Sequence, residues 1–293
     1  MKDIRGYLLL SLILLFTVQL CPTAIAQKND VLSVFVSIPP QKYLVERIGQ
    51  NRVAVSIMVG PGQSPATYEP SPKQMGTLSN AKLYFQIGVP FEKIWIDRIR
   101  QLNNKLRIIE CCEQIASRKL FGHAHNMETI GLAIDPHIWT SPVYVKDLVR
   151  LIKMTLINED PKFRDFYEKN SAELINDLEK LDLDIRAEFE NIRTPYFIVT
   201  HPSWGYFSDT YNLRQIVIEQ HGTEIKARKM TELIELAKSE GIHFIYTQKQ
   251  FNDASAYILA KELGAEVVEI DPLAENYIEN LRHAARVIGK GLH

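Results

Sequence analysis

A long amphipathic run, from about Pro161 to Ile192, most constrains the fold of this chain. Pro161 suits a first helical position, Asp160 suits the capping position before it, and Pro195 closes the segment. At 1.5 Å per residue, a helix of roughly 30 residues reaches about 45 Å, so it can run along two lobes and join them. The prediction rests on apolar side chains that recur at steps of three and four, namely Phe163, Tyr167, Leu174, Leu178, Leu181, Ile185, Phe189 and Ile192.

The segments on either side of this helix alternate between strand and helix patterns. Before it, apolar and β-branched runs predict strands at 31–38, 52–59, 82–87 and 105–110, with helices at 43–48, 72–79 and 91–102. After it, strands are predicted at 195–200, 214–219, 242–247 and 266–270, with helices at 204–211, 230–240, 254–263 and 277–287. Such alternation indicates parallel strands joined by right-handed crossovers. We therefore predict an α/β fold of two lobes, each with a roughly four-stranded parallel sheet flanked by helices, joined by one long rigid backbone helix.

The N-terminal 26 residues have the pattern of a cleaved secretory signal. A short basic start precedes the apolar run 7–20, and small residues at 24–26 suit signal peptidase. A membrane anchor is less favoured, because about 14 apolar residues are fewer than the roughly 20 that span a bilayer. A lipid anchor at Cys21 is less favoured because the bulky Leu20 precedes it. We expect a periplasmic protein with no membrane span after signal cleavage.

These features predict a division of the chain into a signal peptide (1–26), an N-terminal lobe (27–155), a long linking helix (156–193) and a C-terminal lobe (194–293). The 35 acidic residues nearly cancel the 34 Lys and Arg residues. Since nucleic-acid binders usually carry a basic excess, that class is disfavoured.

Polar side chains follow three predicted strands of the C-terminal lobe: His201, Gln248 and Asp271. Ligands of open parallel sheets lie beyond the carboxyl ends of the strands, so these side chains share one edge. His137 precedes the linking helix and comes from the other lobe. Two imidazoles and one carboxylate suit a borderline divalent cation. Taken singly, each histidine is more typical of a hydrogen-bonded loop or core residue.

Several stretches, in order, resemble the zinc- and manganese-binding proteins of bacterial ABC importers: VSIPPQKYLVERIG, TYEPSPKQM, DPHIWTSP, HPSWGYFSDTYNL, IYTQKQF and EIDPL. The resemblance covers most of residues 31–290. It implies two α/β lobes on a rigid helix, metal in the cleft between them, little lobe motion on binding, and docking on a membrane permease. The family's second and third histidine ligands fall on His137 and His201, and its acidic ligand falls on Asp271.

Two positions depart from that family. Its first histidine ligand is replaced by Ala66, which cannot bind a metal, and a position that is often acidic is Gln248. Water, the Gln248 carbonyl, or His123 and His125 in a loop could complete the site. Water or Gln248 is favoured over the loop histidines, because a mobile loop loses conformational entropy when it docks.

The leading hypothesis is a solute-binding protein that captures a divalent metal and delivers it to an ABC permease, acting as a monomer. Two histidines favour Zn²⁺, whereas a shell rich in carboxylate or water shifts the preference toward Mn²⁺ or Fe²⁺. A metal hydrolase is disfavoured, since the chain lacks HExxH, GxSxG and a phosphate-binding glycine loop. Because of Ala66, binding of a non-metal solute, or an adhesin or accessory role, stays open as the alternative.

Overall fold

The structure is a computed structural model that describes residues 31–112, 115, 135–218, 227–251 and 253–293. The predicted signal peptide and the loop carrying His123 and His125 lie outside the described residues. Residues Val31–His293 form one compact unit.

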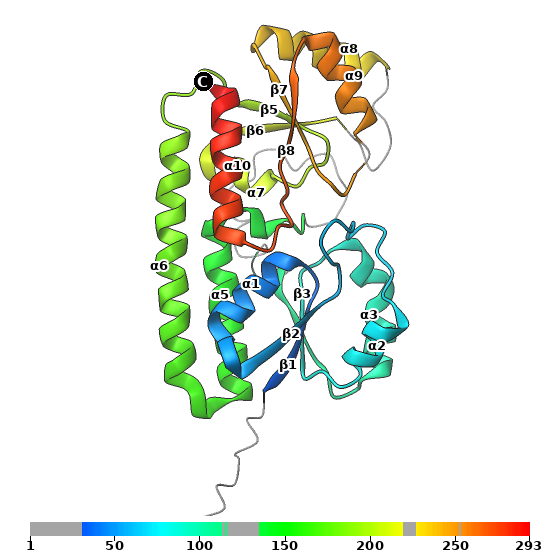
Figure 1. Cartoon of the computed structure of the whole chain (residues 1–293), viewed down its shortest axis with the longest axis vertical. Coiled ribbons are helices and arrows are strands. Elements are labelled where there is room, and N and C mark those ends of the chain that lie inside the picture. The colour runs from blue at the N-terminus through cyan, green and yellow to red at the C-terminus, as the bar shows by residue number, and fades with distance from the viewer. Residues whose placement is uncertain (1–30, 113–114, 116–134, 219–226, 252) are drawn as a thin grey trace, which may run out of the picture. The chain divides into compact units, whose positions relative to one another are not determined.

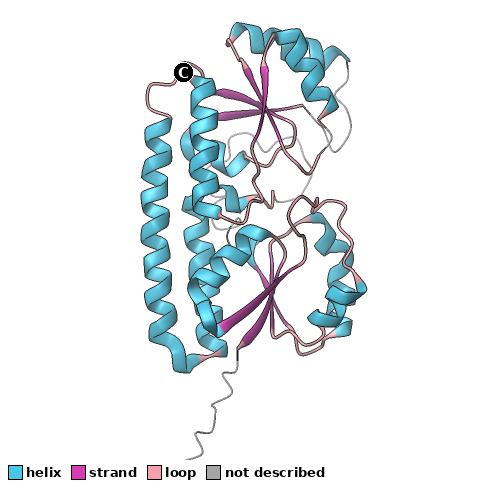
Figure 2. Cartoon of the chain, in the orientation of Figure 1, coloured by secondary structure: helices cyan, strands magenta, loops and turns pink. Residues whose placement is uncertain are grey.

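Two four-stranded parallel sheets organise this unit (Figure 1, Figure 2). The first contains β1 (Leu32–Val36), β2 (Val53–Ile57), β3 (Leu83–Gln86) and β4 (Arg107–Glu110), in the order β2-β1-β3-β4. The second contains β5 (Tyr196–Val199), β6 (Arg214–Val217), β7 (Phe244–Thr247) and β8 (Glu266–Glu269), in the order β6-β5-β7-β8. The two orders are the same permutation, so the two halves of the chain share one topology. The predicted fold class is confirmed.

Helices connect the strands at the predicted places. The first half contains α1 (Pro39–Gly49), α2 (Pro72–Leu78) and α3 (Pro90–Leu102). The second half contains α7 (Gly205–Tyr211), α8 (Ala227–Ser239), α9 (Ala254–Leu263) and α10 (Tyr277–Leu292). Short 3-10 helices in the described ranges are η1 (Gln50–Arg52), η2 (Ile138–Thr140) and η3 (Pro161–Phe163).

The long helix is α6 (Arg164–Glu188), which follows η3 directly. It is shorter than the predicted run at both ends. Its last residue is Glu188, and in the turn that follows Asn191 adopts the left-handed region with φ 59°. A second helix, α5 (Pro142–Glu159), packs along α6 and was not predicted (Figure 1).

Asp160 occupies the capping position of η3, but its side chain does not form the cap. Its Oδ2 instead accepts hydrogen bonds from Arg52 Nη2 at 2.8 Å and from the Tyr167 hydroxyl at 3.1 Å. The carboxylate therefore ties η1 to the α5–α6 connection, and an ion pair with Arg52 takes the place of the expected cap.

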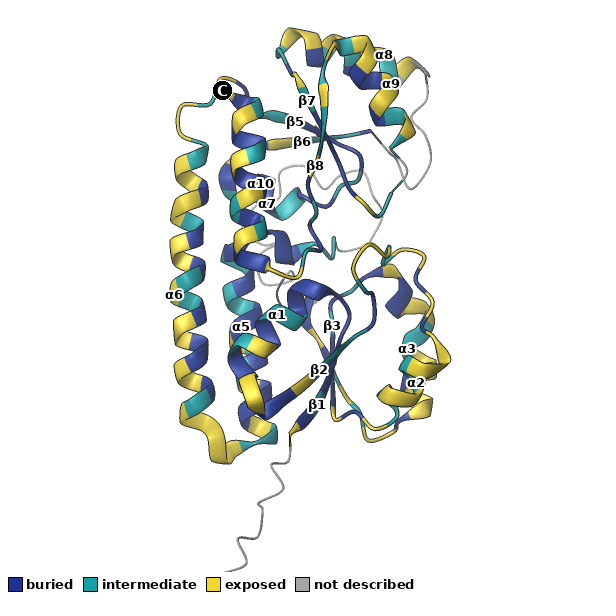
Figure 3. Cartoon of the chain, viewed as in Figure 1, coloured by how far each residue is buried: buried dark blue, intermediate teal, exposed yellow. Residues whose placement is uncertain are grey.

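One continuous hydrophobic core runs through both halves of the chain. It includes strands β1 and β3, the inner faces of α5 and α6, and most of α10. The alternation of buried and exposed residues along α6 is visible in Figure 3. A smaller cluster lies on the other face of the second sheet, against α8 and α9. Within the described residues, no helix combines the length and apolar character needed to cross a bilayer.

Candidate metal site

Three strands of the second sheet end side by side. Backbone pairing aligns Val199 of β5 with Tyr246 of β7, and Thr247 of β7 with Glu269 of β8. His201 and Asp271 each follow within two residues of such a strand end. The predicted edge therefore exists, and it carries polar side chains.

His137 and His201 lie together, although they belong to different halves of the sequence. Their ring centroids are 5.6 Å apart and the ring planes are inclined at 75°. A metal bound by two imidazoles at about 2.0–2.1 Å from each nitrogen places the ring centroids roughly 5 Å apart. The observed centroid separation is close to that value.

His137 sits just before η2, between an aromatic ring and a carboxylate. The Trp139 indole lies with its centroid 5.0 Å from the imidazole, and the Trp139 Nε1–H donates to the Pro272 carbonyl at 2.9 Å. Asp135 Oδ1 lies 2.6 Å from His137 Nδ1. The ring is thus packed on one side and hydrogen-bonded at one edge.

His201 is in an apolar setting that favours its neutral form. Its ring stacks on Phe251, with centroids 4.0 Å apart and planes inclined by only 17°. Desolvation by burial lowers the pKa of His201 to about 3; nearby His137 acts in the same direction and Asp135 opposes both. A neutral imidazole has a free lone pair, so His201 can act as a metal ligand at neutral pH without first losing a proton.

Gln248 is buried beside His201, and its amide is already engaged. Its Oε1 accepts from the Ser203 hydroxyl at 3.3 Å, and its Nε2 lies 3.4 Å from the His201 carbonyl oxygen. Its Nε2 also lies 3.2 Å from the Ser203 hydroxyl oxygen. The amide oxygen has two lone pairs, so it can accept from Ser203 and still bind a cation. Water and Gln248 therefore both suit the completing position.

Asp271 is held at one of its two oxygens. Oδ1 accepts from Gln250 Nε2 and from the Leu273 backbone N–H, both at 2.9 Å. The Trp139 bond to Pro272 joins its loop to the segment that carries His137. Even so, among the residues that the structure describes, no three His, Cys, Asp or Glu side chains are grouped closely enough to hold a metal ion. The structure brings the two histidines together and does not add Asp271 to them.

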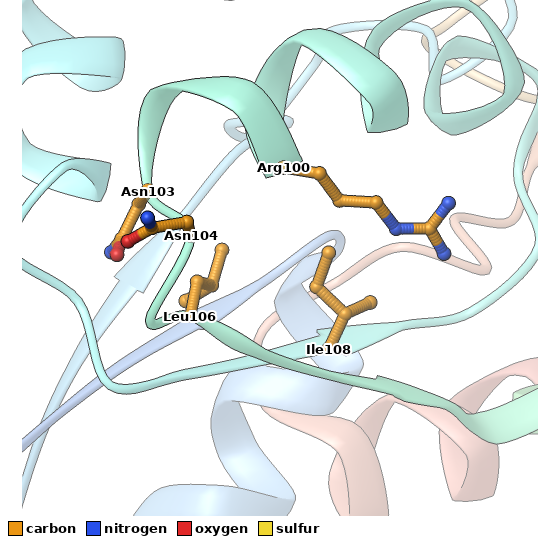
Figure 4. Close-up of a pocket in the computed structure, with 5 residues that line it drawn as sticks. All are labelled: Arg100, Asn103, Asn104, Leu106 and Ile108. Atoms are coloured by element: carbon orange, nitrogen blue, oxygen red, sulfur yellow. The ribbon is translucent and has the colours of Figure 1, made fainter.

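The remaining candidate positions, and a hollow among the described residues, add nothing to this site. Ala66 lies on an exposed loop, and His123 and His125 fall outside the described ranges. A hollow of about 420 Å³ lies elsewhere, and neither histidine lines it (Figure 4). It is bordered by Arg100, Asn103, Asn104, Leu106 and Ile108. The Asn103 amide donates to the Leu78 and Ala81 carbonyls, which gives that residue a structural role.

Sequence reasoning missed the residues that contact the candidate ligands. Asp135 and Phe251 contact the two histidines, and Gln250 contacts Asp271. One signal was present: a carboxylate two residues before a histidine can reach the histidine's own backbone N–H and ring. Phe251 and Gln250 carry no comparable local signal, because their contacts come from the folding of separate loops.

Comparison with known proteins identifies the family. A family model described as "Zinc-uptake complex component A periplasmic" matches residues 34–291. The high-affinity zinc uptake system protein ZnuA of Bacillus subtilis (strain 168) is 26% identical over 255 residues, which cover 84% of this chain and 80% of that protein.

Solved structures agree with that assignment. A crystal structure of ZnuA is 36% identical, with a TM-score of 0.81, over 90% of this chain and all of that one (100%). A crystal structure of a ZnuA deletion mutant with zinc bound is also 36% identical, with a TM-score of 0.83, over 90% of this chain and 98% of that one.

Proposed function

Because this chain belongs to the family of periplasmic zinc-uptake component A proteins, ZnuA, we propose that it captures Zn²⁺ outside the cytoplasmic membrane and delivers it to an ABC permease. His137 and His201 supply the imidazole ligands, and Asp271 supplies a carboxylate. The observation that carries the proposal is the approach of two imidazoles, from distant parts of the sequence, to a centroid separation of 5.6 Å.

The donor set favours zinc. Neutral imidazole is a common zinc ligand, and the low pKa of His201 keeps its ring neutral. With Ala66 in place of a histidine, water or the Gln248 carbonyl oxygen completes the shell. A shell richer in oxygen moves the preference toward Mn²⁺ or Fe²⁺, so the affinity order of Zn²⁺ and Mn²⁺ is part of the test.

Asp271 joins the histidines when the cation is present. Its Oδ1 is occupied by Gln250 and Leu273, so Oδ2 is the oxygen we assign to the metal. Binding through one oxygen keeps those two hydrogen bonds, which orient the carboxylate.

The protein acts as a carrier and not as an enzyme. The matching family is one of uptake components, and the relatives above are named for zinc uptake or zinc binding. The mature chain starts after residue 26 and acts in the periplasm as a monomer. Its two lobes, 27–155 and 194–293, are joined by the linking segment 156–193, and the loaded protein docks on the permease.

Calorimetric titration of the chelator-stripped mature protein with Zn²⁺ and Mn²⁺ tests the proposal. We expect His137→Ala and His201→Ala each to weaken Zn²⁺ binding by more than the roughly 10–100-fold typical of an indirect contact. Asp271→Ala should weaken it less, since one water can take its place. His283→Ala, at an exposed position of α10, is the matched control and should bind like the wild type. Zn²⁺ affinity that is unchanged in both His137→Ala and His201→Ala would refute the assigned site.

A further inference from the structure

The Asp135 carboxylate is bonded to His137 at two points. Its Oδ1 accepts from the His137 backbone N–H at 2.9 Å and lies 2.6 Å from the ring nitrogen Nδ1. An ionised carboxylate has no hydrogen to donate, so Nδ1 carries the hydrogen in this bond. In a neutral ring with its hydrogen on Nδ1, the lone pair is on Nε2, which is the nitrogen that can bind a metal ion.

Asp135 is itself anchored from both halves of the chain. Its backbone carbonyl accepts from the Tyr206 hydroxyl of α7 at 3.0 Å and lies 3.5 Å from the Cys112 Sγ that follows β4. The position of this carboxylate therefore depends on the second half of the sequence, although Asp135 and His137 both precede α5.

The second carboxylate oxygen lies against a glycine. A Cβ atom added to Gly205, the first residue of α7, would lie 2.9 Å from Asp135 Oδ2 and 3.3 Å from Gln215 Nε2. Cβ contacts below 3.0 Å are essentially never seen in proteins. Because Gly205 has no side chain, there is space beside α7 for the Asp135 carboxylate.

The Trp139 indole, which is fixed by its bond to the Pro272 carbonyl, lies with its centroid 5.0 Å from that of the His137 ring. Rotation of the imidazole away from its present plane would break the 2.6 Å contact with Asp135. Packing and one hydrogen bond thus restrict both the tautomer and the direction of the ring.

We propose that Asp135 is the positioning residue of the metal site: it fixes His137 as the Nδ1–H tautomer and directs Nε2 toward His201, and Gly205 provides the space for it. This inference rests on the proposed function, because it takes His137 to be a ligand. It adds Asp135, which is not itself a ligand. It also makes the orientation of His137, in the first half of the chain, depend on Gly205 of α7 in the second half.

Two measurements on the full mature protein test it. In nitrogen-15 spectra of the metal-free protein, the His137 ring should show a protonated Nδ1 and a hydrogen-free Nε2. Asp135→Ala should lose this defined tautomer and weaken Zn²⁺ binding by about 10- to 100-fold. Asp135→Asn keeps an acceptor oxygen and should recover part of both. Gly205→Ala should act in the same direction as Asp135→Ala, although it alters neither histidine.

Gly76→Ala is the matched control for Gly205→Ala. Gly76 also lies in a helix, but a Cβ there meets nothing within 4 Å, so tautomer and affinity should stay as in the wild type. Wild-type Zn²⁺ affinity in Asp135→Ala, or a protonated Nε2 in the wild-type ring, overturns the inference. If His137→Ala itself binds Zn²⁺ normally, the assigned ligand is wrong, and the tautomer of the metal-free ring still decides whether Asp135 positions it.

Discussion

Glu92 is a buried carboxyl group in the first half of the chain, and its surroundings favour the protonated form. It accepts from the Ser37 hydroxyl, from the Ile87 N–H at 2.9 Å and from the Gly88 N–H at 2.6 Å. These bonds favour the ionised form, but desolvation by burial outweighs them and raises the pKa of Glu92 to about 7. Folding thus prefers a neutral carboxyl group at this position.

We predict that Glu92 makes the folded protein less stable as pH rises. A carboxyl group with a folded-state pKa near 7 and an unfolded value of 4.5 stabilises the folded state fully below pH 4.5. That contribution is lost as pH rises through about 7, by roughly 3 kcal/mol at most, at 1.36 kcal/mol per pKa unit. Urea unfolding of wild type and Glu92→Gln at pH 5 and pH 8 measures it.

The difference in pH slope is the decisive quantity, because a glutamine amide also changes the hydrogen bonds to Ile87 and Gly88 and shifts stability at every pH. The free energy of unfolding of the wild type should fall relative to that of Glu92→Gln between the two pH values. Glu173→Gln, at an exposed position of α6, should keep the wild-type slope. Equal slopes in wild type and Glu92→Gln would show that Glu92 is ionised throughout.

At the scale of single residues, some members of the candidate site could be predicted from the sequence and others could not. His137 and His201 could be paired because each stands next to a recognisable strand end or motif, and the fold brings them to 5.6 Å. Gln248 was a reasonable oxygen donor by type, but its amide is bonded to Ser203, a contact that spacing along the chain does not reveal. The same limit applies to Asp271, whose Oδ1 is taken by Gln250. Side-chain hydrogen bonds between separate loops depend on rotamers and exact placement, which residue type alone does not specify.

At the scale of elements, the strands and most helices were predicted from periodicity, and α5 was missed. Its sequence, PVYVKDLVRLIKMTLINE, does carry the helical pattern, because its buried residues recur mainly at steps of three and four: Val145, Leu148, Val149, Ile152 and Leu156. Helix α5 packs against α6, α1 and η2. The periodic signal was therefore present in the sequence, and sequence reasoning did not use it.

The connection between α5 and α6 is held by one ion pair with little solvent access. The Arg52 and Asp160 side chains are 9% and 13% exposed, and the Arg52 guanidinium also lies 3.8 Å from the centre of the Phe163 ring. Removing one partner of such a pair leaves the other charge without full compensation. We therefore predict that Arg52→Ala lowers the free energy of unfolding by about 3 kcal/mol or more, as measured by chemical denaturation.

An exposed ion pair in the first turns of α6 provides the comparison. Arg164 and Glu168 are about half exposed and 3.5 Å apart at their closest atoms. Arg164→Ala should cost less than about 1 kcal/mol, since surface ion pairs contribute little. If Arg52→Ala costs no more than Arg164→Ala, the α5–α6 connection is held by packing alone, and the Arg52–Asp160 pair does not stabilise the fold.

At the scale of the whole molecule, the second sheet divides its side chains between two cores. In β5, Phe197 and Val199 belong to the large core shared by both halves, whereas Ile198 belongs to the smaller cluster under α8 and α9. In β7, Tyr246 and Ile245 divide in the same way. This is the two-residue alternation of a strand with both faces covered. The large core makes the two halves interdependent, whereas the buried residues that the structure describes in α8 and α9 belong to the smaller cluster.

We therefore predict a single cooperative unfolding transition for the two halves, preceded by local opening of α8 and α9. Native-state hydrogen exchange of the metal-free mature protein should give lower opening free energies for amides of α8 and α9 than for amides of α6 and α10. Helix α10 is the internal control, because it lies in the same half of the sequence and packs on α6. Two separate thermal transitions, one for each half, would contradict a shared core. Equal protection of α9 and α10 would show that the small cluster is as firmly attached as the large one.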